Sequence, residues 1–345
     1  MSRASRIKSL SPTSGIPGGE VIVEYKQISG DVLNSLEVRF DGASAHLIAA
    51  NRTRAIAIIP ETATDGAVRV DVANDRAVES SERGVDFMIA RQLAANLHPV
   101  TNPAFNPADG ALFVTRSGSR GEHVPVSLYR IDREGTIEDF SGDIMNPTSI
   151  AFDRTGRMFV TSRFDGTVYR VTGDRELIAF VSDLGVATGL AFNREGQMFV
   201  GDRSGTIYRV NEIGEAKPWA QHEPSVSAYH LAFGPDDQLY VTGPTVSSFD
   251  SIIRFDEGGN PREFFRGLGR PQGLALDAAG NVYVAAALRG RRGIVRISHD
   301  ANQAELIVAG MNLVGVAFGP QGDLIVASNE AVFSLPLGIP GALLT

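Results

Sequence analysis

The chain contains no cysteine and only one tryptophan in 345 residues. The absence of cysteine excludes disulfide bonds, thiolate metal sites and a catalytic cysteine. The first 15 residues lack an apolar core of signal-peptide length, and no run of ~18 apolar residues occurs anywhere. We therefore expect a protein without membrane insertion, cytoplasmic as the sequence stands or extracytoplasmic if a leader has been removed.

Several motifs of catalysis and nucleotide binding are also missing. The sequence has no Gly-x-Ser-x-Gly elbow, no P-loop, no His-Glu-x-x-His helix and no dinucleotide-binding fingerprint. The net charge of −8 argues against a nucleic-acid partner, because such proteins present a basic face. The partners that remain are a small molecule or another protein.

What the chain does have is a repeat of roughly forty residues. Three short runs of β-branched, aromatic and aliphatic residues recur six times between residues 104 and 335. The first run ends in Ala-Phe or Ala-Leu, the second begins at positions such as Met158, and the third at positions such as Val168. A fourth run follows, as at residues 177–180. This period with four strands per unit is typical of a propeller blade and predicts six blades.

The last repeat is incomplete. It has three strand-like runs, ending near Leu335, and no fourth run before Thr345. The residues just before the first repeat have the pattern of a fourth strand. We therefore expect residues 91–96 to supply the outer strand of the sixth blade, which would join the ends of the ring and leave no open edge.

Residues 1–90 follow a different pattern. About seven short runs, some of them alternating, are separated by turn residues such as Gly18 and Gly42. This arrangement favours an Ig-like β-sandwich. A chain of this length usually forms more than one domain. The expected fold is therefore all-β, with a sandwich over residues 1–90 and a six-bladed propeller over residues 91–345.

Two family resemblances go with this fold. Residues 147–160 and 271–285 resemble the NHL repeat, and the ring is similar to the TolB-like superfamily that includes gluconolactonase-like and strictosidine-synthase-like propellers. Residues 11–19 and 38–42 resemble the IPT/TIG family of Ig-like domains, although Glu24 to Lys26 depart from its usual glycine. The second resemblance implies a spacer, adhesion or dimerisation unit.

In such a ring the start of each first strand and the exit of each second strand meet at one face, around the axis, where ligands usually bind. The long connections at residues 116–127, 243–251 and 286–293 belong to this face, and variable loops commonly carry recognition. From the first-strand starts we predict four ligand contacts: Thr148, Thr188, Tyr229 and Gln272.

Arginine is enriched at the second-strand exits. Arg116, Arg163 and Arg203 occupy nearly equivalent positions in three successive repeats. On an acidic protein, clustered guanidinium groups at the mouth would suit a carboxylate or a phosphate. The alternative is that they are solvated loop charges paired with nearby acids such as Asp165, Asp202 or Glu122.

His230 is the candidate for acid–base chemistry, because it lies at a first-strand start and its ordinary pKa is near 6.5. It could instead be a hydrogen-bonded channel histidine.

Asp202, Asn102 and Asn329 could together offer oxygen ligands to Ca²⁺ or Mg²⁺. The gluconolactonase resemblance implies a metal held by a first-blade Glu with Asn and Asp from later blades. Here Asn102 stands at the first-blade position.

Three functions remain open. The first is a binding protein whose arginine-rich mouth holds an anionic small molecule or a partner loop. The second is a divalent-metal-dependent hydrolase, such as a lactonase, or a lyase. The third is a structural or adhesion module that self-associates through its Ig-like domain.

Overall fold

The structure of the chain is a computed structural model that describes residues 7–28, 33, 35–73, 84–118 and 122–342. Its elements are β strands, as the sequence predicts. Residue contacts divide the chain into two compact units. The first contains residues 1–92 with the segments Arg291–Ile294 and Leu306–Asn312, and the second contains the remainder. Among the described residues, no helix has the length and apolar character needed to cross a membrane.

The first unit is a sandwich of two sheets. One sheet has the order β1 (Ile7–Ser11), β3 (Glu20–Tyr25), β7 (Arg54–Ile58), β6 (His46–Ala50). The other runs β2 (Ser14–Gly15), β9 (Val85–Ile89), β8 (Gly66–Ala73), β4 (Glu37–Phe40), β5 (Ala43–Ser44). The expected strands are thus present, and they form two layers.

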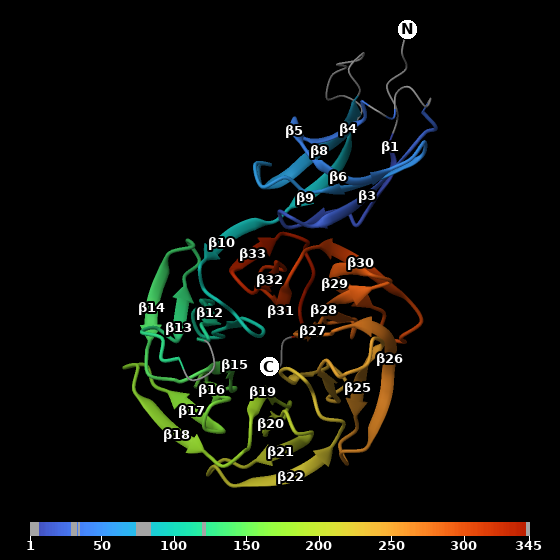
Figure 1. Ribbon diagram of the computed structural model, residues 1–345. Coiled ribbons are helices and arrows are strands. Elements are labelled where there is room, and N and C mark those ends of the chain that lie inside the picture. The colour runs from blue at the N-terminus through green and yellow to red at the C-terminus, as the bar shows by residue number, and fades with distance from the viewer. Residues whose placement is uncertain (1–6, 29–32, 34, 74–83, 119–121, 343–345) are drawn as a thin grey trace. The chain divides into compact units, whose positions relative to one another are not determined.

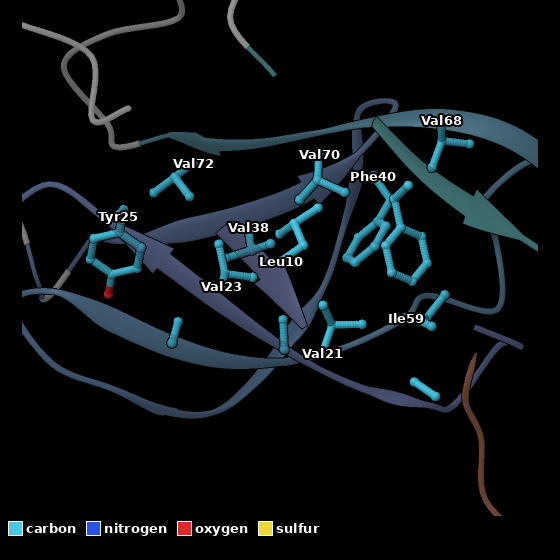
Figure 2. Packing of buried hydrophobic residues seen from close by; sticks show 14 of the residues in the cluster. Leu10, Val21, Val23, Tyr25, Val38, Phe40, Ile59, Val68, Val70 and Val72 are labelled. Carbon is cyan, nitrogen blue, oxygen red and sulfur yellow. The ribbon is translucent and has the colours of Figure 1, made fainter. Parts of the chain in front are cut away.

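Alternating apolar residues of both sheets form the sandwich core. Val21 and Val23 come from β3, and Val38 and Phe40 come from β4; all four are fully buried. Figure 2 shows these side chains between the two layers. The Phe40 ring meets the Phe87 ring edge-on, with centroids 5.3 Å apart. Strands with a period of two bury one face each, so the alternation in the sequence determines which side chains enter this core.

The described strands between Arg91 and Leu335 form a ring of four-stranded sheets, called blades 1 to 6 in chain order (Figure 1). Blade 1 is β11 (Ala104–Phe105), β12 (Leu112–Thr115), β13 (Leu128–Ile131) and β14 (Ile137–Ser141). Blade 2 is β15 (Pro147–Phe152), β16 (Met158–Ser162), β17 (Thr167–Val171) and β18 (Leu177–Val181). Blade 3 is β19 (Ala187–Phe192), β20 (Met198–Asp202), β21 (Thr206–Val210) and β22 (Ala216–Gln221).

Blades 4 to 6 complete the ring. Blade 4 is β23 (His230–Phe233), β24 (Leu239–Thr242), β25 (Asp250–Phe255) and β26 (Pro261–Gly269). Blade 5 is β27 (Leu274–Leu276), β28 (Val282–Leu288), β29 (Arg291–Ile297) and β30 (Ala304–Ala309). Blade 6 consists of β31 (Leu313–Phe318), β32 (Leu324–Ser328), β33 (Ala331–Leu335) and β10 (Arg91–Ala95). First strands lie near the centre and fourth strands at the circumference (Figure 1).

The predicted ring closure is confirmed. β10 pairs with β33, so the outer strand of blade 6 comes from the residues that precede blade 1. The amide of Leu97 donates to the carbonyl of Glu330 at 3.1 Å. Ala94 and Leu97 are buried in a cluster with Ile325 and Val332 of blade 6. Main-chain pairing and apolar packing therefore both join the two ends of the ring.

The recurring threonine of the second strands links neighbouring blades. The hydroxyl of Thr115 donates to the carbonyl of Thr148 at 3.4 Å, and that of Thr161 to the carbonyl of Thr188 at 3.3 Å. Thr242 donates in the same way to the carbonyl of Gln272 at 2.6 Å. Each acceptor lies at or just before the start of the next blade's first strand. These bonds hold the starts of the first strands in place around the axis.

Candidate functional site

Two of the three predicted mouth arginines lie close together. Arg163 follows β16, and its guanidinium donates to the Ser117 hydroxyl of blade 1 at 3.2 Å. Burial and then the charge of Arg203 lower the pKa of Arg163. Arg203 follows β20 of blade 3 and is exposed. The two guanidinium groups therefore repel one another across a half-buried position that spans blades 1 to 3.

Two of the three carboxylates expected to neutralise these arginines accept hydrogen bonds from other groups. Asp165 accepts hydrogen bonds from the Thr167 amide at 3.1 Å and from the Tyr169 hydroxyl at 2.7 Å. Asp202 accepts from the Val186 amide at 2.8 Å and from the Ser204 hydroxyl. Within the described part of the chain, no ion pair joins a carboxylate to Arg163 or Arg203.

Arg116 behaves differently. Its guanidinium donates to the Tyr129 hydroxyl at 3.2 Å, and Tyr129 belongs to β13 of the same blade. Its backbone amide donates to the carbonyl of Ser127. Arg116 is thus tied within blade 1, and its role as a ligand contact stays a prediction.

The predicted first-strand contacts are mostly buried. Thr148 donates to the carbonyl of Asn146 at 3.4 Å, and Thr188 donates to the carbonyl of Gly201 at 3.3 Å. Thr188 also accepts from the Tyr229 amide at 3.0 Å. Gln272 is half-buried and hydrogen-bonds His230. These side chains shape the inner wall, and direct contact with a ligand stays a prediction for them.

His230 lines a cavity of about 300 Å³ along the ring axis, whose walls come mainly from the first strands. Its side chain is 2% exposed, and Nε2 has no hydrogen-bond partner among the described residues. Burial lowers the pKa of His230 to about 4, and the hydrogen bond with Gln272 acts in the opposite direction. The imidazole is therefore neutral at pH 7, as a proton acceptor must be.

The burial of His230 predicts a pH dependence of stability. The folded pKa of about 4 lies below the ordinary 6.5, so the unfolded chain binds the proton more readily. Stability from the neutral imidazole is present above pH 6.5 and is lost as the pH falls toward 4. The loss approaches about 3 kcal/mol, since one pKa unit corresponds to ~1.4 kcal/mol. Urea unfolding of wild type and His230→Gln at pH 7 and pH 4.5 should show a smaller loss in the variant. Equal losses of stability in wild type and variant would contradict the assignment of this pH dependence to His230.

The residues predicted as metal ligands are not seen to share a site, and their role as metal ligands stays a prediction. The Asn102 amide donates to the Leu274 carbonyl at 2.7 Å and accepts from the Val316 amide at 3.0 Å, so both of its polar atoms are used. Asp202 holds the Val186 amide, as described above, and Asn329 is exposed in the turn between β32 and β33. No group of three or more His, Cys, Asp or Glu side chains could hold a metal ion among the described residues.

A second cavity, of about 260 Å³, was not found by sequence reasoning. It lies between the β22–β23 connection and the long β24–β25 connection. Tyr229 and Asp250 line it, and Oη of the first and Oδ2 of the second are buried without a partner among the described residues. Tyr229 was predicted as a ligand contact, whereas Asp250 was missed. The length of the 243–251 connection, which contains Asp250, is the feature of the sequence that points toward this cavity.

Comparison with known proteins supports the fold. No family model matches the chain, and no curated protein gives a significant match. Solved structures do match. An auxiliary nutrient binding protein from Bacteroides thetaiotaomicron has a TM-score of 0.57 at 13% identity, covering 96% of this chain and 98% of its own. A gluconolactonase from Xanthomonas campestris scores 0.58 at 16% identity, covering 72% and 89%.

A third structure is regucalcin from Agrobacterium tumefaciens, described as a calcium-binding protein. It has a TM-score of 0.58 at 18% identity, covering 74% of this chain and 95% of its own. Identities this low show the fold and leave the activity open. The chain is therefore similar in fold to β-propeller proteins described as binding proteins and to others described as lactonases.

Proposed function

We propose that this protein is a binding protein whose propeller holds a small anionic ligand, or an acidic loop of a protein partner, with Arg163 and Arg203. The observation that carries the proposal is the pair itself. Two guanidinium groups lie close enough for the charge of one to lower the pKa of the other, and no described carboxylate pairs with either. A bound anion would relieve the repulsion and accept paired N–H donors from both groups.

The half-buried position of Arg163 strengthens this expectation. A charge–charge interaction is worth more where water is partly excluded, and burial is the first cause of the lowered pKa of Arg163. The Ser117 hydroxyl on one side orients the guanidinium. A nutrient-binding protein among the structural neighbours is consistent with small-molecule binding on this fold.

Isothermal titration calorimetry with citrate, succinate and inorganic phosphate tests the proposal. Each charge-assisted hydrogen bond contributes ~1.5–3 kcal/mol, so Arg163→Gln or Arg203→Gln should weaken the preferred anion about tenfold or more. Arg262→Gln removes the same charge from an exposed site on β26 and should leave the affinity unchanged. The proposal fails if no probe binds, or if the three variants behave alike.

A hydrolase or lyase is the second candidate, because His230, whose Nε2 is unpartnered among the described residues, lines the axial cavity. A neutral imidazole there could accept a proton from a bound water or substrate. The expected calcium or magnesium ligands are committed to backbone groups, so we assign no step to a metal. Hydrolase or lyase activity that is lost in His230→Gln, with the fold intact, would favour this candidate.

The third candidate concerns the sandwich. The resemblance to IPT/TIG domains supports a role of residues 1–90 in positioning the protein or in self-association. Two sheets that pack over a core of buried residues are the architecture that such modules share.

A further inference from the structure

The cavity beside blade 4 includes neither Arg163 nor Arg203 in its lining. It has a volume of about 260 Å³ and lies where the β22–β23 connection meets the β24–β25 connection. The Ser225 hydroxyl donates to the Pro244 carbonyl at 2.9 Å, and the Val226 amide donates to the same carbonyl at 2.8 Å. These bonds join the two connections, so the walls of the cavity are held together by the protein's own backbone.

Two of the lining residues each carry a polar atom that is buried and without a partner among the described residues. Asp250 is 3% exposed. Its Oδ1 accepts from the Thr245 amide at 3.1 Å and hydroxyl at 2.6 Å, while Oδ2 has no donor. Tyr229 is 2% exposed, and its Oη is also unpartnered. A buried polar atom without a hydrogen-bond partner is costly, so two such atoms on residues that line one cavity indicate a missing hydrogen-bonding group.

The Tyr229 ring is fixed in place. A Cβ added at Gly243 would lie 3.0 Å from its Cδ1, so the ring packs directly on the backbone of the β24–β25 connection. Its amide is bonded to Thr188 of the neighbouring blade. The hydroxyl position is therefore determined by the scaffold, as a binding group's position should be.

The charges around the cavity favour a cation. Glu223 and Glu263 join Asp250 in the lining, against one guanidinium from Arg266. His222 adds no charge at neutral pH, because burial lowers its pKa, although Glu223 acts in the opposite direction. Glu263 already accepts from the Ser251 hydroxyl at 2.8 Å. The lining therefore carries an excess of negative charge next to an acceptor that lacks a donor.

We propose that this cavity binds the primary ammonium group of a small amine. An ammonium group has three N–H donors, which match Oδ2 of Asp250, Oη of Tyr229 and the carboxylate of Glu223 at the rim. The aliphatic part of the amine would lie along Val241 and Ile253, which line the same cavity. An alcohol could donate to Oδ2 of Asp250 and accept from the Tyr229 hydroxyl, but it carries no positive charge to balance the acidic lining. A metal ion is disfavoured because the described residues form no cluster that could hold one.

Calorimetry with n-butylamine and n-butanol at pH 7 tests the inference. The two probes have the same length and differ in the ammonium group, so n-butylamine should bind about tenfold or more tighter. Asp250→Asn keeps an acceptor for Thr245 and removes the charge, and should weaken n-butylamine about tenfold or more. Tyr229→Phe should weaken it about threefold to tenfold. Asp300→Asn, which removes an exposed charge on another blade, should leave the affinity unchanged.

The inference is overturned if n-butanol binds as well as n-butylamine, or if the amine does not bind. It is also overturned if Asp250→Asn and Asp300→Asn give equal affinities. Thermal unfolding followed by circular dichroism checks that the variants fold. If Asp250→Asn does not fold, Tyr229→Phe and the comparison of the two probes on the wild-type protein still decide the question.

Discussion

Replacing Ala94 by aspartate is expected to lower the free energy of unfolding by about 3–5 kcal/mol. Ala94 lies in β10, the strand that closes the ring, and is 4% exposed within the cluster that contains Leu97, Ile325 and Val332. A carboxylate there would be buried without a partner, which is among the costliest changes that a fold experiences. Urea unfolding monitored by circular dichroism at pH 7 measures the change.

The neighbouring residue supplies a matched control. Ala95 belongs to the same strand but points to the other side and is exposed. Ala95→Asp adds the same charge and makes the same change in β propensity as Ala94→Asp. It should change the free energy of unfolding by no more than about 0.5 kcal/mol. If the two variants were equally stable, β10 would not pack into blade 6 in the way described.

The second large effect is expected at the axis. Gly273 precedes β27, and a Cβ built on it would lie 1.9 Å from Oδ1 of Asn102 and 2.7 Å from the carbonyl oxygen of Val314. Gly273→Ala must therefore displace Asn102, which bridges the backbones of β27 and β31. Overpacking and the loss of these two bonds together should cost about 3 kcal/mol or more.

Gly173 is the control for this substitution. It lies in a turn of blade 2, and nothing lies within 4 Å of its added Cβ. Its backbone does not adopt a positive φ, so alanine introduces no backbone strain. Gly173→Ala should leave the urea midpoint unchanged or raise it slightly. If Gly273→Ala and Gly173→Ala had the same urea midpoint, the first strands would be less crowded at the axis than the structure indicates.

Much of the fold was predictable from local patterns. Runs such as the one from Met158 carry the strand signal in their β-branched and aromatic residues, and glycines such as Gly156 mark the turns between them. The closing strand could be predicted because a blade with three strands leaves an unpaired edge that another segment must cover. These features depend on residues close in the sequence or on a simple count of strands.

The site was less predictable, because its chemistry depends on partners far away in the chain. Asn102 and Asp202 have the right side chains for a metal, but their oxygens are bonded to backbone groups of Val316 and Val186. A sequence cannot distinguish a carboxylate that caps a turn from one that is free. Arg163 and Arg203 could be singled out from their equivalent positions in the repeats, whereas the unpartnered Oδ2 of Asp250 could be found only in the structure.

The arginine pair is the feature on which the functional account depends, and a crystal soaked in selenate tests it most directly. Selenate is a tetrahedral oxyanion, and its selenium can be located by anomalous diffraction. The account predicts a selenium peak on the propeller face that contacts the guanidinium groups of both Arg163 and Arg203, and no peak there in Arg163→Gln crystals. A crystal structure in which protein carboxylates neutralise both arginines and selenate binds elsewhere would contradict it.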